Sequence, residues 1–220
     1  MIQITLVVSS AQQVKPSEKI THKVFQVPYE AGTTAESVAK ALMEKGTASW
    51  EVFRKTDEMR RVMCESLLNN TDFLNGVRGF DLLVHDTGAS CSVLLAEYLG
   101  IPRVELLLGP PNTPFGMYHM TPMPVSYIPQ ILPGYSDKMS FLQRVVNLGS
   151  YTVSRFFMAL LSRTMNDIKF KYNIKPERSF QEAAGDAELV LITADFALEY
   201  PQPLLPGIYR LLHLSVTCIL

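Results

Sequence analysis

Asp86 is the side chain of this sequence whose position best suits a chemical role. It follows the apolar run Phe80–Val84, and helical spacing resumes at Ser92 and stops at Gly100. Because ligands of open α/β sheets bind outside the carboxyl ends of the strands, Asp86 is a candidate catalytic or binding acid. An acid that only caps the helix or stabilises the turn would occupy the same place, so both interpretations stay open at this point.

A long Pro-rich segment, residues 109–129, carries the side chains that best suit an apolar ligand. They are Met117, Tyr118, His119 and Met123. A loop of this length within a domain is usually either functional or disordered, and its apolar content disfavours disorder. Thioether and aromatic groups can repack around varied apolar molecules, so these four residues are the predicted ligand-binding residues. Packing against a further domain is the alternative interpretation.

The elements that must position these residues alternate between strands and helices. Strands are predicted at 1–8, 23–28, 80–84, 101–108 and 188–193. Helices are predicted at 33–46, from about 48 onward, around 72–77, and at 92–99, 140–172 and 178–184. This alternation indicates an α/β fold, with a Rossmann-like parallel sheet and flanking helices.

Composition limits the classes of partner. The chain has 220 residues, 47% of them hydrophobic, and a formal net charge of −1. That length suits one compact domain or one lobe of a larger protein, and we favour the lobe. Acidic and basic residues are interspersed, so no basic stripe predicts a nucleic-acid partner. The three cysteines have no histidine at metal-ligand spacing, and the sequence therefore predicts no metal site.

The predicted helix at 140–172 raises the question of a membrane surface. Its apolar face is wide, a break is expected at Gly149, and basic residues flank it: Arg144, Arg155, Arg163 and Lys169. An interfacial helix and a buried helix of a large domain share this pattern. No run of 18 apolar residues predicts a membrane span, and residues 1–8 are typical of a strand rather than a signal peptide.

Four segments carry a resemblance to a known family, the UDP-glucuronosyltransferases among the UDP-glycosyltransferases. They are Phe80–Asp86 with Cys91, Glu97–Pro102, Pro124–Pro129 and Ala194–Pro206. The resemblance implies the N-terminal half of a GT-B fold, in which one Rossmann-like lobe binds a lipophilic acceptor and a second binds the UDP-sugar. Residues 1–207 are then a partial acceptor-binding lobe whose first strand is missing. Residues 208–220 depart from the family pattern as a divergent tail.

The resemblance also implies a mechanism. In the family a histidine takes the proton of the acceptor hydroxyl, an aspartate orients that histidine, and the oxygen displaces UDP with inversion at the sugar. Asp86 matches the aspartate, whereas no residue of this chain matches the histidine. His85 is not promoted to this role, because neighbouring residues of a strand point to opposite faces. The donor lobe is also unmatched. We therefore expect a UDP-sugar as co-substrate, no cofactor held by this chain, and no transferase activity of the isolated chain.

Two classes of function remain open. The chain is either the acceptor-binding fragment of a glycosyltransferase, or a catalytically inactive variant that binds acceptors or pairs with full-length relatives. The family implies the endoplasmic reticulum membrane or lumen, with a signal peptide and a membrane anchor that are not found in this sequence. Acceptor identity, the sugar, the oligomeric state and glycosylation at Asn69 are not predicted.

Overall fold

The structure is a computed structural model that divides into two compact units. It describes residues 3–12, 14–15, 20–30, 40, 49–130, 134–196 and 199–211. One unit comprises residues 1–79 with 217–220, and the other comprises residues 80–216. Except for Lys40, the predicted helix at 33–46 lies outside the described residues, as do residues 212–220 of the predicted tail.

The N-terminal unit contains two parallel strands and two helices. Strand β1 (Thr5–Ser9) pairs with β2 (Thr21–Phe25), and both lie near their predicted positions. Helix α2 (Trp50–Asn69) runs into α3 (Thr71–Val77), where the Asn70 side chain accepts a hydrogen bond from Phe73 N. That bond satisfies one of the free amides at the start of α3. The Phe73 ring also packs edge-on against Phe25 of β2.

The larger unit contains a four-stranded parallel sheet in the order β3-β4-β5-β6. The strands are β3 (Leu83–Asp86), β4 (Arg103–Leu107), β5 (Leu189–Ile192) and β6 (Ile208–Arg210). Strand β3 begins three residues later than predicted and includes Asp86. Strand β6 lies inside the segment that the sequence assigns to a divergent tail. These findings confirm a parallel α/β fold with flanking helices.

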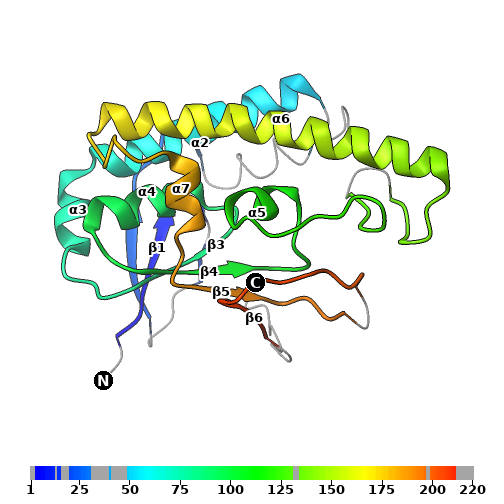
Figure 1. The fold of residues 1–220 in the computed structure, drawn as a ribbon. Helices are drawn as coiled ribbons and strands as arrows, with labels where there is room; N and C mark the ends of the chain where they lie inside the picture. Colours follow the sequence, from blue (N-terminus) through cyan, green and yellow to red (C-terminus); the bar gives the residue numbers. More distant parts are fainter. Residues whose placement is uncertain are drawn as a thin grey trace. The chain divides into compact units, whose positions relative to one another are not determined.

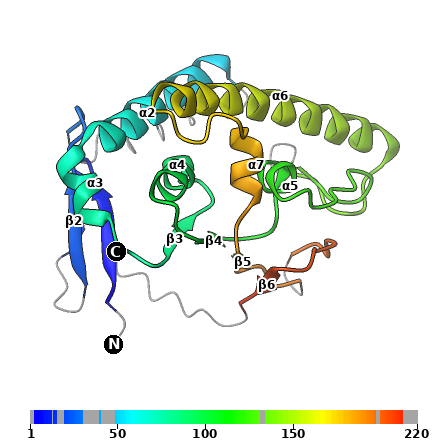
Figure 2. The same ribbon diagram turned by 60° about the vertical axis from the view of Figure 1, so that its left-hand side comes forward.

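Helices lie on one face of this sheet. Between the strands run α4 (Ser90–Leu99), α5 (Thr113–Tyr118), α6 (Phe141–Lys171) and α7 (Phe180–Gly185). In Figures 1 and 2, α4, α5 and α7 lie on the same side of the strands, with α6 beyond them. The reason is topological: the strand order advances in one direction only, and right-handed crossovers then place the helical connections on the same face.

Two expectations about helices are wrong. Part of the Pro-rich segment is helical, because the Asn112 side chain accepts from Phe115 N and Pro114 stands in the first turn of α5, where its missing N–H costs nothing. The predicted break at Gly149 is absent, since α6 runs unbroken for 31 residues. A single glycine weakens a helix by only about 1 kcal/mol, which tertiary packing can offset.

One hydrophobic cluster of the larger unit lies between the sheet and α5. It contains Leu107, Phe115, Val190, Ile192 and Ala194. Residues that alternate with these along the strands face the other side, where Val84 is 57% exposed. Among the described residues, no helix has the length and apolar character that a membrane span requires.

Candidate functional site

Asp86 ends β3 at the carboxyl edge of the sheet, level with Leu106 of β4. Its Oδ1 accepts a hydrogen bond from Gly88 N at 2.7 Å, and its backbone carbonyl accepts from Ala89 N at 2.9 Å. The side chain is exposed, and the N-cap of α4 is Ala89 rather than Asp86. Asp86 is therefore a turn acid with one carboxylate oxygen engaged, at the edge where ligands of parallel sheets bind. Its catalytic role stays a prediction.

His85 points to the opposite, buried face of β3 and is 7% exposed. Its Nδ1 lies 2.9 Å from the carbonyl oxygen of Asp86, and its Nε2 lies 3.0 Å from an Arg103 guanidinium nitrogen. Burial lowers the pKa of His85, although the Asp86 carbonyl and the Glu105 charge act in the other direction. A buried imidazole with both nitrogens engaged cannot serve as a base for an acceptor at the surface.

Arg103 and Glu105 form a buried ion pair on the same face. The guanidinium donates to Glu105 Oε2 at 3.0 Å, and the same oxygen lies 3.3 Å from His119 Nε2. Although burial raises the pKa of Glu105, the adjacent His119 and Arg103 outweigh that effect and hold it below its usual value. This network joins β3 and β4 to the end of α5, and the sequence analysis missed it. The signal was available, because two charges spaced i, i+2 in an apolar strand share one face.

The predicted ligand-binding residues lie in and after α5, packed against the protein itself. Met117 and Tyr118 are 8% and 9% exposed, and the Tyr118 ring meets Phe180 of α7 edge-on at 5.8 Å. The His119 side chain faces Glu105, and Met123 packs against Gly116, where an added Cβ would lie 2.6 Å from the Met123 Cγ. Their contact with an acceptor stays a prediction.

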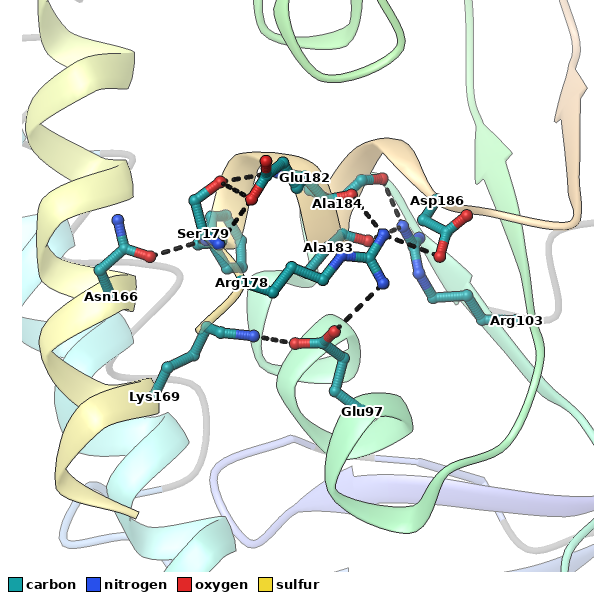
Figure 3. A network of polar contacts seen from close by, with 11 residues as sticks. Glu97, Arg103, Asn166, Lys169, Arg178, Ser179, Glu182, Ala183, Ala184 and Asp186 are labelled. Atoms are coloured by element: carbon teal, nitrogen blue, oxygen red, sulfur yellow. Dashed lines mark hydrogen bonds and ion pairs between the residues drawn. The ribbon is translucent and has the colours of Figure 1, made fainter. Parts of the chain in front are cut away.

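A second polar cluster joins α4, α6 and α7 (Figure 3). Lys169 of α6 pairs with Glu97 of α4, whose other oxygen lies 3.5 Å from Arg178, and Arg178 reaches Asp186 at 2.7 Å. Lys169, one of the four basic residues that the sequence places along this helix, is 1% exposed and therefore does not contribute to a basic surface. Burial, together with the nearby positive charges of Arg178 and Lys175, lowers the pKa of Lys169 to about 8.

A cavity of about 390 Å³ lies beside this cluster. Its charged lining residues are Glu97, Arg103, Lys175, Arg178, Asp186 and Glu188. Arg103 begins β4 and Glu188 directly precedes β5, so the cavity lies at the amino edge of the sheet, away from Asp86. Within the described ranges no group of three or more His, Cys, Asp or Glu side chains is arranged to hold a metal ion.

A family model and several named relatives that match this chain indicate the same protein family. The family model described as UDP-glucoronosyl and UDP-glucosyl transferase matches residues 2–215. UDP-glucuronosyltransferase 1A6 of Oryctolagus cuniculus is 37% identical over 153 residues, which are 68% of this chain and 28% of the relative. The Homo sapiens 1A6 protein is 31% identical over 212 residues, which are 88% of this chain and 38% of the relative. The chain thus spans less than two-fifths of the length of either relative.

Other relatives differ in the sugar that their names state. The Homo sapiens 2-hydroxyacylsphingosine 1-beta-galactosyltransferase is 30% identical over 148 residues, 66% of this chain and 27% of that protein. Among solved structures, a UDP-glucosyltransferase from Polygonum tinctorium matches with a TM-score of 0.42 and 14% identity, covering 94% of this chain and 52% of that one.

Proposed function

Since the chain belongs to the UDP-glucoronosyl and UDP-glucosyl transferase family, we propose that it is the acceptor-binding part of an enzyme that transfers a sugar from a UDP-sugar to a hydroxyl group of a lipophilic acceptor. The observation that carries the proposal is the position of Asp86, an exposed carboxylate at the carboxyl edge of a parallel sheet. In this fold class that edge is where ligands bind.

Asp86 is proposed to orient a histidine and to stabilise its charged form while that histidine takes the proton of the acceptor hydroxyl. The Gly88 amide holds one carboxylate oxygen of Asp86, and the other oxygen has no bond within the described part of the chain. That second oxygen is available to an imidazole N–H. The activated acceptor oxygen then displaces UDP at the sugar carbon with inversion.

Which step of the reaction we assign to this chain depends on how much of a relative's length the chain covers. The chain matches 38% of the human 1A6 relative, so the UDP-sugar site is proposed to lie in the remainder of a complete enzyme. We propose residues 1–207 as the acceptor-binding lobe, and we extend it to Arg210 because β6 pairs with β5. The isolated chain is then expected to bind acceptors without transferring sugar, since removing members of a catalytic unit removes most of the rate.

A binding experiment with the chain itself tests this proposal. We expect 1-naphthol, a lipophilic hydroxyl compound, to bind in equilibrium dialysis, and UDP-glucuronate and UDP-glucose to show neither binding nor transfer. Met123→Ala is expected to weaken naphthol binding several-fold, whereas Met120→Ala, of the same residue type but 76% exposed, is the matched control. Sugar transfer by the chain, or UDP binding without naphthol binding, would contradict the assignment.

The first half of α6 supports a further part of the proposal, contact with a membrane surface. Its large exposed apolar side chains are Phe141, Leu142, Val145, Val146, Leu148, Val153 and Phe156. Between residues 140 and 166 the sequence has three arginines and no acidic residue. An apolar face flanked by arginines suits the interface of an anionic bilayer, and the endoplasmic reticulum membrane is the proposed location.

Vesicle sedimentation tests the membrane contact. We expect the chain to bind vesicles that contain phosphatidylserine more tightly than vesicles of phosphatidylcholine alone, and Leu142→Ser with Phe156→Ser to remove most of the binding. Phe170→Ser is the control, because Phe170 is 79% exposed at the other end of α6. Equal loss in the control would refute the assignment to the first half of the helix. Concentration-dependent self-association without vesicle binding would instead favour the alternative of a variant that pairs with other copies or relatives.

A further inference from the structure

A buried polar chain links the backbone of Asp86 to the end of α5. It runs from the Asp86 carbonyl through His85 (2.9 Å) and Arg103 (3.0 Å) to Glu105 (3.0 Å), and on to His119 (3.3 Å). None of the four linking side chains is more than 7% exposed. One end of this series of contacts is at Asp86, the predicted catalytic acid. The other end is His119, one of the predicted acceptor-binding residues.

The hydrogen-bond partners determine the protonation of His85. A backbone carbonyl only accepts, so Nδ1 must carry the proton, and a guanidinium only donates, so Nε2 must be the acceptor. His85 is therefore neutral and held in a single tautomer. Burial, which disfavours the charged form, acts in the same direction.

Arg103, which donates to the His85 imidazole, is itself held by three other acceptor residues. Besides His85 and Glu105, its guanidinium donates to the carbonyl oxygens of Ala183 and Ala184 in α7. A planar guanidinium offers five donors in a fixed geometry, which a lysine ammonium does not reproduce. The position of the Arg103 guanidinium thus depends on β4 and α7 together. Because the guanidinium also bonds to His85, it links both elements to β3.

At Asp86 the imidazole adds a restraint on the backbone carbonyl from a side chain that lies outside the turn. The Gly88 and Ala89 amides also bond to Asp86, but both belong to the turn itself and would move with it. The His85 ring connects the same carbonyl oxygen to Arg103, 18 residues away in sequence. Without it, the turn carrying the carboxylate would be joined to β4 only by the backbone pairing and by the Thr87 hydroxyl, which donates to the Leu106 carbonyl at 3.0 Å, within the described part of the chain.

We propose that His85 and Arg103 are positioning residues for Asp86: they fix the turn that presents its carboxylate, and they exchange no proton with substrate. The catalytic meaning of this positioning rests on the proposed function. The positioning itself does not, because every contact that carries it lies within the larger unit.

The test uses the intact chain labelled with nitrogen-15. In the unmodified protein we expect the His85 ring to show a proton on Nδ1, none on Nε2, and no titration between pH 5.5 and about 8, where free imidazole changes charge. A ring that carries its proton on Nε2, or that titrates at the ordinary value, would overturn the proposal without any variant.

Two substitutions separate the two ring nitrogens. In His85→Asn the side-chain amide can keep the donor near the Nδ1 position, whereas in His85→Gln it reaches the Nε2 position and the donor to Asp86 is lost. We expect exchange of the Gly88 and Ala89 amides to be about fivefold faster in His85→Gln, as for loss of one hydrogen bond, and to change less in His85→Asn. The Val190 amide, which bonds to Gly207, is the reference for a general loss of stability.

Arg103→Lys completes the design. It is expected to resemble His85→Gln at the Gly88 and Ala89 amides, because a lysine cannot hold all of the Arg103 acceptors. Equal acceleration at Val190 in the variants would assign the residues a purely structural role and refute the proposal. If these results hold while 1-naphthol fails to bind, the proposed function falls and the positioning of Asp86 stands.

Discussion

The buried pair of Lys169 and Glu97 leads to an asymmetric prediction. Glu97→Gln should destabilise the protein much more than Lys169→Met. After Glu97→Gln, Lys169 has no carboxylate within ion-pair distance in the described part of the chain, and its charged side chain is 2% exposed. After Lys169→Met, Glu97 retains Arg178 at 3.5 Å, and the methionine fills the space left by the lysine stem.

The magnitudes follow from burial. Leaving one member of a buried pair without its partner costs about 3–5 kcal/mol, which applies to Glu97→Gln. For Lys169→Met we expect about 1 kcal/mol, because the remaining carboxylate keeps a cation and apolar surface is buried. The double variant Glu97→Leu with Lys169→Met should recover most of the loss, since replacing a buried ion pair by apolar groups is often close to neutral.

Urea unfolding followed by circular dichroism at 222 nm is the measurement. With a slope of about 2 kcal/mol per molar urea, a difference of about 2 kcal/mol between the single variants separates their midpoints by about 1 M. Equal midpoints, or a larger loss in Lys169→Met, would refute the reasoning that Glu97 has a second cation and Lys169 has no second anion. A double variant less stable than Glu97→Gln would show that packing, not charge, decides this site.

Three further predictions follow from single positions. Gly185→Ala should cost about 2 kcal/mol or more in urea unfolding, because the added Cβ would lie 2.3 Å from the Tyr118 carbonyl oxygen; Gly149→Ala, where nothing lies within 4 Å of the added Cβ, should be neutral or stabilising. Asn147→Ala should cost about 3 kcal/mol, since this fully buried side chain bonds three backbone groups of residues 125–130 that would lose their partners; a thermal melt that matches the unmodified protein would contradict this. For Lys169 the folded pKa of about 8 lies below the unfolded value of 10.5, so the unfolded chain holds more protons between these values, and stability gains up to about 1.4 kcal/mol per pH unit as pH rises. Lys169→Met should lack this slope, so the unmodified protein, which is already the more stable of the two, should gain on the variant, and the difference in unfolding free energy should widen from pH 8 to pH 10.

Local patterns predicted most elements of the fold. Helix α4 ends at Gly100, whose φ of +68° lies in the left-handed region that favours glycine, and the stop was readable from that residue type. Apolar runs located β4 and β5 because a strand covered by helices excludes charge from most of its positions. Where a local signal was weak, the prediction failed: prolines concealed α5, and β6 was missed although it pairs with β5.

The residues of the candidate site also fall into those that the sequence predicted and those that it did not. The sequence by itself determined that an acid follows an apolar strand and precedes a helix, because chain order and side-chain type suffice for that inference, and four segments determined the family resemblance. Only the tertiary structure decided which charges are buried and with which partners. Lys169 meets Glu97 across 72 residues, and Arg103 meets Ala183 across 80. Burial of a charge depends on what the fold brings against it, and groups this far apart in the chain leave no periodic signal in the sequence.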